Sequence, residues 1–149
     1  MKISNGTLVL VADGSKLLLF RNEGDEKFPV LETLAHEVAD NPPTSEQGAD
    51  RPGRSFSSSS DRRSAYGDTD WHQQSEDDFA RHAAGILEKA AQQEGGVPVI
   101  VAAAPRTLGE LRKHYGRETQ SRLQGEIAKD LANQETDGII KVIVAQPEA

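Results

Sequence analysis

The chain has 149 residues, a length typical of one domain, and a formal net charge of −7. An acidic balance of this size argues against non-specific binding of nucleic acid by the whole surface, and leaves room only for a local basic patch. The absence of cysteine excludes disulfides, thiol nucleophiles and thiolate metal sites. No stretch approaches the ~20 apolar residues of a membrane-spanning helix, and the first residues lack the features of a signal peptide. We therefore expect a cytoplasmic protein.

The first residues predict an antiparallel meander of three strands. Residues 7–13 and 16–23 are β-rich runs joined by Asp13-Gly14-Ser15. An Asp-Gly pair between apolar runs is a strong hairpin signal, because both turn positions favour positive φ. After a polar turn, residues 28–36 predict the third strand.

A long polar segment follows at residues 40–74, with prolines, glycines and a serine run but no apolar periodicity. Loops of this length inside a compact domain are usually functional or disordered. Its middle carries four arginines against two aspartates, a local excess of +2. Two interpretations stay open: a flexible solvated insertion, which composition favours, or a mobile arm that orders on a partner through Arg54, Arg62 and Arg63.

Ser75 is expected to begin a helix, because it can cap the N–H groups of the next three residues and all three are acids. Apolar side chains at helical spacing then form one stripe: Phe79, Ala83, Ile86, Leu87 and Ala90. Gly95 and Gly96 are expected to end this helix.

The apolar run at residues 97–104 predicts a strand buried on both faces. Pro105 stops that run and suits the first position of a second helix. Leu108 and Leu111 follow at helical spacing, and Gly116 is expected to end the helix. A buried strand that leads into a helix is the core of a layered α/β domain, in which ligands tend to lie at the carboxyl ends of the strands.

Two charged residues stand at such strand ends. Arg106 could bind a phosphate or carboxylate at the helix start, and the preferred alternative is an ion pair with Glu110 or a nearby acid. Asp13 could hold Mg²⁺ together with other acids, but the neighbouring strand ends in three alanines, so a turn residue is the preferred interpretation. The four histidines lack the paired spacing of a zinc helix. We therefore predict no catalytic residue, no metal site and no cofactor.

The C-terminal part leaves alternatives open. Residues 118–131 fit a helical face, but their last apolar residues also alternate as a strand would, and Gly125 favours a break between a helix and a strand. The apolar residues at 139–144 fit a helix or a strand. The whole chain, residues 1–149, is expected to form a single α/β domain. Its mixed five-stranded sheet begins as the meander and continues through β-α units, with helices packed on it.

This order and its motifs resemble the bacterial host-attachment protein family, named as required for attachment to host cells. The matching stretches are residues 11–15, Gly53-Arg54, Phe79-Ala80, 105–111 and 129–131. The resemblance implies that Lys129-Asp130-Leu131 lies on a strand and that a helix follows it.

That family is similar to the middle domain of the archaeal and eukaryotic peptide-chain release factor, which has a ribonuclease H-like sheet. The release-factor domain carries a Gly-Gly-Gln loop just before its first long helix. Here His72-Gln73-Gln74 stands in that place, so Gln74 matches while both glycines are absent. Glycines let the backbone enter strained conformations beside a peptidyl-tRNA ester, so their absence argues against hydrolysis.

Three functions follow from the resemblance. The leading one is a non-enzymatic module that binds RNA or the ribosome through Arg54, Arg62, Arg63, Gln74 and Arg106. The second is an indirect role in adhesion to host cells through protein contacts. The third is an RNA or peptidyl-tRNA hydrolase.

Overall fold

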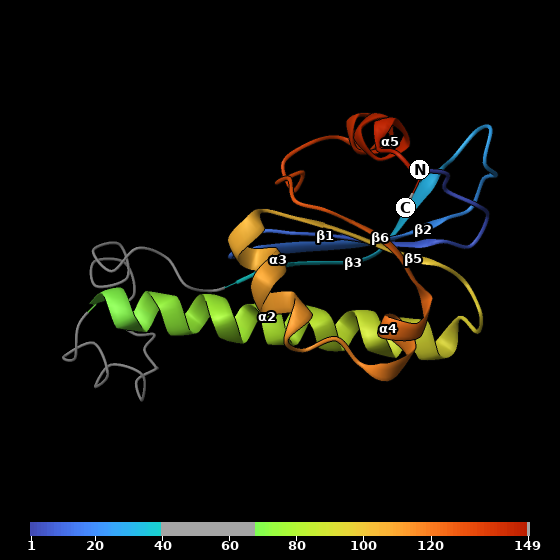
Figure 1. Ribbon diagram of the computed structural model, residues 1–149. Helices are drawn as coiled ribbons and strands as arrows, with labels where there is room; N and C mark the ends of the chain where they lie inside the picture. The colour runs from blue at the N-terminus through green and yellow to red at the C-terminus, as the bar shows by residue number, and fades with distance from the viewer. Residues whose placement is uncertain (40–67, 149) are drawn as a thin grey trace.

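The computed structural model describes residues 1–39 and 68–148, with the backbone alone for residues 68–75. Five strands form one sheet in the order β3-β2-β1-β5-β6 (Figure 1). The strands are β1 (Leu8–Ala12), β2 (Lys16–Asn22), β3 (Leu31–Val38), β5 (Val99–Ala103) and β6 (Leu123–Ile127). The helices are α2 (Asp68–Gln93), α3 (Pro105–Arg112), α4 (Arg117–Arg122) and α5 (Thr136–Ala145).

The strand directions confirm the predicted mixed sheet. The pairs β1–β2 and β2–β3 are antiparallel, which gives the expected meander. The pairs β1–β5 and β5–β6 are parallel; α2 precedes β5, and α3 and α4 connect β5 to β6. The α/β class and the five-stranded mixed sheet are therefore as the sequence predicts.

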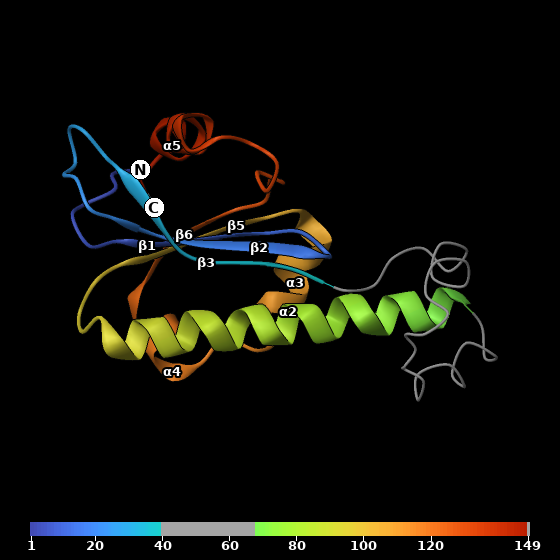
Figure 2. The ribbon, with the colours of Figure 1, turned by 180° about the vertical axis from the view of Figure 1, so that it is seen from behind.

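The two central strands, β1 and β5, are buried along their whole length, as expected for the apolar run after Gly96. Alternate side chains enter two separate hydrophobic clusters because successive residues of a strand point to opposite faces. Leu10 and Val101 belong to the cluster shared with α2 and α3, whereas Val9 and Ile100 belong to the cluster shared with α5. Figures 1 and 2 show the result from both sides: α5 covers one face of the sheet, and α2, α3 and α4 lie on the other.

Helix α2 contains the predicted apolar stripe. Phe79, Ala83, Leu87 and Ala90 are buried against the sheet, and Ile86 is partly buried beside them. The expected start at Ser75 is wrong, because α2 already begins at Asp68. Its first turn contains two aspartates, which suit the positive end of the helix dipole, and neither proline nor glycine interrupts residues 68–84. The helix ends where predicted, before Gly95, and Gly96 has a φ of +83°.

The first hairpin forms as predicted, but not by the expected backbone. No residue of the turn at residues 13–15 has a positive φ. Instead, the Asp13 carboxylate accepts the N–H groups of Ser15 at 2.8 Å and of Lys16 at 2.7 Å. The side chain therefore replaces the strained turn conformation.

The third strand begins at Leu31 rather than at Phe28. Side chains capture the backbone before it: the Asp25 carboxylate accepts the N–H of Phe28, and the buried Asn22 amide oxygen accepts the N–H of Val30. The N–H groups of Phe28 and Val30 are therefore bonded to side chains of the turn and of the end of β2, and not to the backbone of a neighbouring strand.

Three expectations about the C-terminal half are corrected. Gly116 does not end α3, which stops at Arg112; it is the N-cap of α4. Gly125 lies inside β6 instead of marking a break, and a Cβ there would lie 2.5 Å from Cε of Met1. Residues 129–131 follow β6 and are not part of it, because the strand ends at Ile127.

The order of a short helix and then a strand, α4 followed by β6, is one of the alternatives that the sequence left open. The apolar tail is helical: Ile139 and Ile143 of α5 are fully buried on the sheet. Within the described ranges, no helix has the combination of length and apolar character needed to cross a membrane.

Candidate functional site

The carboxyl ends of the parallel strands form one edge of the sheet, and this edge is the candidate site. Ala12 of β1 pairs with Ala103 of β5, so the turn after β1 and the start of α3 are neighbours in the fold. Helix α2 passes the same edge, because a Cβ on Gly14 would lie 3.1 Å from the Glu76 carboxylate carbon. In Figure 1 the N-terminal part of α2 runs beyond the sheet at the end where α3 begins.

Arg106 lies at this edge as the second residue of α3, behind Pro105. Its side chain is exposed and has no hydrogen-bond or ion-pair partner among the described residues. The preferred alternative, an ion pair with Glu110 or a nearby acid, is not found among the described residues: none of their ion pairs includes Arg106, and Glu110 pairs with Lys113 at 3.1 Å. Arg106 is therefore open to an anionic group.

Gln74 lies in α2, two residues before Glu76, so its backbone is near the same edge. The expectation that His72-Gln73-Gln74 forms a loop before the helix is wrong, since these residues are within the first two turns of α2. The three loop arginines, Arg54, Arg62 and Arg63, fall outside the described residues. The structure thus brings Arg106 and the backbone of Gln74 to one edge, and leaves the loop arginines as a prediction.

Asp13 is a turn residue, as the preferred interpretation has it. Its carboxylate is occupied by two backbone N–H groups, and the neighbouring strand continues into Ala104 with no acid. Within the part of the chain that the structure describes, no group of three or more His, Asp or Glu side chains is placed to hold a metal ion.

Two further carboxylates, Glu88 and Glu126, position the helices, and the sequence analysis did not single them out. Glu88 of α2 accepts the N–H of Thr119 at 2.9 Å, the Thr119 hydroxyl at 3.0 Å and the N–H of Glu118 at 3.1 Å. It therefore caps the start of α4 from another helix. Burial acts to raise the pKa of Glu88, but these donors, with the Gln92 amide, hold it below its ordinary value.

Glu126 of β6 is the second such carboxylate. It accepts the Tyr115 hydroxyl at 2.6 Å and the Arg112 guanidinium at 2.8 Å. Partial burial acts to raise the pKa of Glu126, but the Arg112 and Tyr115 donors lower it overall. Burial and the bond to Glu126 raise the pKa of Tyr115 well above 10. This cluster ties the end of α3 to the edge strand of the sheet.

The sequence signal for these contacts was present but weak. Glu88 lies between the buried Leu87 and Ala90, at the margin of the apolar stripe, where a carboxylate is expected to have a partner. Its partner is 31 positions away along the chain, so no local pattern identifies it.

Comparison with known proteins supplies the family. No curated protein matches the chain. A family model described as bacterial archaeo-eukaryotic release factor family 12 matches residues 6–143, a range that covers all five strands and every helix except the last two residues of α5. This match confirms the resemblance to release-factor domains. The chain belongs to bacterial archaeo-eukaryotic release factor family 12.

Proposed function

We propose that this protein is a single release-factor-like module that associates with RNA or the ribosome in the cytoplasm without catalysing hydrolysis. The observation that carries the proposal is the family match across residues 6–143. The sheet supports a ribonuclease H-like relationship as well. Its order β3-β2-β1-β5-β6, with β2 antiparallel to both of its neighbours, suits that fold.

The binding residues that we propose are Arg54, Arg62 and Arg63 of the loop, with Gln74 and Arg106. Arg106 supports the proposal because its guanidinium is exposed at the carboxyl edge and has no partner among the residues described. An arginine in that state is suited to a phosphate of an RNA backbone. The backbone of Gln74 lies in the first two turns of α2, near the same edge.

The absence of both glycines before Gln74 argues against hydrolysis, and the helical backbone at residues 72–74 supports that view. A residue inside a regular helix lacks the conformational freedom of a glycine-rich loop at a reacting ester. We therefore propose association rather than catalysis.

Co-sedimentation with purified ribosomes through a sucrose cushion tests the function. We expect the wild-type protein to co-sediment at low salt and to be released as the salt concentration rises, because phosphate contacts exchange with counterions. Replacement of Arg54, Arg62 and Arg63 by alanine should reduce the bound fraction. A matched control removes three exposed lysines elsewhere: Lys27, Lys89 and Lys141.

No wild-type protein in the ribosome pellet at low salt would contradict the proposal. Equal loss in the arginine variant and the lysine control would show that total charge matters and that the loop does not. Peptidyl-tRNA turnover that depends on Gln74 would replace association with hydrolysis as the function.

A further inference from the structure

The turn between α3 and α4 is the most basic short stretch of the chain. Residues 112–117, which we call the basic turn, have the sequence Arg-Lys-His-Tyr-Gly-Arg, with three fixed positive charges and no acid. The whole chain carries a net charge of −7. A concentrated positive charge on an acidic protein points to a specific anionic partner rather than to general attraction.

The ion pairs around the basic turn are arranged with the bases outward. The Arg112 side chain is 56% exposed while its partner Glu126 is 19% exposed. Lys113 is 65% exposed and its partner Glu110 is 21% exposed. The other ion pairs between side chains of the described residues lack this bias, as in the pair of Arg81 and Asp78, at 63% and 70%.

The reason for this asymmetry lies beneath the turn. Glu126 is held from the protein side by the Tyr115 hydroxyl, so its charge faces inward. The guanidinium of Arg112 and the ammonium of Lys113 keep N–H groups directed to solvent. The acids therefore fix the bases without covering them.

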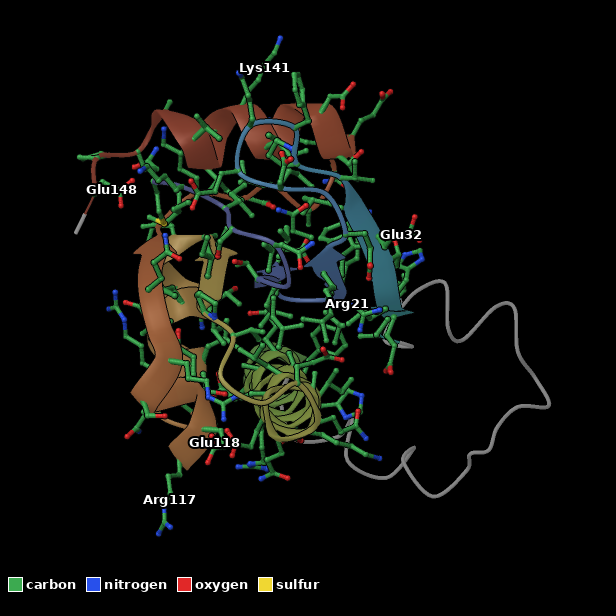
Figure 3. All side chains as sticks on the ribbon, turned by 90° about the vertical axis from the view of Figure 1, so that its right-hand side faces the viewer. Arg21, Glu32, Arg117, Glu118, Lys141 and Glu148 are labelled. Atoms are coloured by element: carbon green, nitrogen blue, oxygen red, sulfur yellow. The ribbon has the colours of Figure 1, made fainter. Side chains whose placement is uncertain are left out.

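Two bases of this surface have no ion-pair partner among the described residues: Arg117 at the end of the basic turn, and Arg106 on α3. Arg117 is exposed, has no side-chain partner among the described residues, and extends away from the protein in Figure 3. Arg106 precedes Lys113, the C-cap residue of α3, by seven residues, which is about two helical turns, so Lys113 follows on from the face of α3 that carries Arg106. The fifth base nearby, Arg122, is turned inward to the carbonyl oxygens of Ala91 and Glu94 and does not belong to this surface.

We propose that the basic turn, extended by Arg106, is a contact surface for the phosphate backbone of RNA. This inference rests on the proposed function and names the surface that would carry it in the described part of the chain. The bases contact phosphates, which carry no sequence information, so binding should be sensitive to salt and nearly independent of base identity.

The test uses the full chain and a fluorescein-labelled oligouridylate of about 20 nucleotides, measured by fluorescence anisotropy. The variant is Lys113→Gln with Arg117→Gln, two exposed side chains that hold no buried group. The control is Lys89→Gln with Lys141→Gln, which removes the same charge from α2 and α5. Figure 3 shows Lys141 on the far side of the protein from Arg117. Circular dichroism should show equal folding of all three proteins.

We expect the Lys113/Arg117 variant to bind the RNA about tenfold more weakly at moderate salt, with the log–log salt slope reduced by about 1.4, which is two single-strand phosphate contacts. The control should change neither quantity by more than about twofold. Oligoadenylate should give the same pattern as oligouridylate.

Equal weakening in variant and control would overturn the inference. So would equal binding of polyglutamate of matched charge, because the surface would then fit an acidic polypeptide as well as RNA. If ribosomes still sediment the Lys113/Arg117 variant as they do the wild type, the basic turn is excluded while the proposed function stands. If the wild type binds neither ribosomes nor RNA, both fail.

Discussion

The carboxylate of Glu88 on α2 accepts the backbone N–H of Thr119 at 2.9 Å and its hydroxyl at 3.0 Å. Thr119 is fully buried, so Glu88 satisfies two donors that water does not reach. The contact joins two helices on the same face of the sheet and fixes the start of the segment that leads into β6.

Replacement of Glu88 by alanine should lower the free energy of unfolding by about 2 kcal/mol, because buried donors lose their charged acceptor. Urea unfolding followed by circular dichroism measures this change. Glu26→Ala, at an exposed turn position, is the matched control and should change stability by less than about 0.5 kcal/mol. Equal effects of the two variants would show that the Glu88 contact adds no stability.

Gly116→Ala should lower the free energy of unfolding, whereas Gly85→Ala should raise it. A Cβ on Gly116 would lie 2.3 Å from the Glu88 carboxylate carbon, so alanine would displace a side chain that is held by several hydrogen bonds, at a cost of about 1–2 kcal/mol. A Cβ on Gly85 meets nothing within 4 Å on the exposed side of α2, so alanine should stabilise by about 0.5–1 kcal/mol. Thermal unfolding of both variants checks the signs.

A double-mutant cycle tests whether the Glu88 side chain is the reason that Gly116→Ala destabilises the protein. In the Glu88→Ala background, Gly116→Ala should cost much less than in the wild type, because the group that obstructs the Cβ is gone. An unchanged cost would mean that something other than Glu88 excludes a side chain there.

The free energy of unfolding should decrease as the pH is lowered, because Glu88 and Glu126 then become protonated. Both have a folded pKa below the ordinary value of 4.5, so the unfolded chain binds protons first as the pH falls. The contribution is present above about pH 4.5 and is lost as the pH falls through the folded pKa values. Urea unfolding across this range should show a shallower pH dependence for Glu88→Gln with Glu126→Gln. A pH dependence as steep as that of the wild type would contradict the assignment.

Tyr115 should ionise far above the ordinary tyrosine pKa of 10.0, because burial and the bond to Glu126 both oppose the phenolate. The chain has two tyrosines, so Tyr66→Phe isolates the signal of Tyr115 in an alkaline titration of ultraviolet absorbance. The interaction stabilises the fold below about pH 10 and is lost at higher pH. Glu126→Gln should move the titration toward lower pH, and an unchanged titration would assign the whole shift to burial.

The sequence predicted what is local or periodic. Continuous apolar runs are enough for the two central strands, since β1 and β5 are buried on both faces and their residues are apolar throughout. The stripe from Phe79 to Ala90 predicted the packed face of α2, and Pro105 marked the start of α3. The start of β3 was misplaced because its limit depends on two side chains, Asn22 and Asp25, that accept the backbone N–H groups before it.

The sequence by itself determined the α/β class, the central strands and the likeness to release-factor domains, because hydrophobic period and motif are properties of neighbouring residues. Only the tertiary structure decided that Gly116 must be a glycine, that Glu126 holds Arg112 outward, and that Arg106 stands without its predicted partner. The first two depend on a side chain from another element of the fold, Glu88 of α2 and Glu126 of β6, whose approach no local pattern specifies. The third depends on which of several nearby bases Glu110 contacts, and spacing along a helix does not decide that.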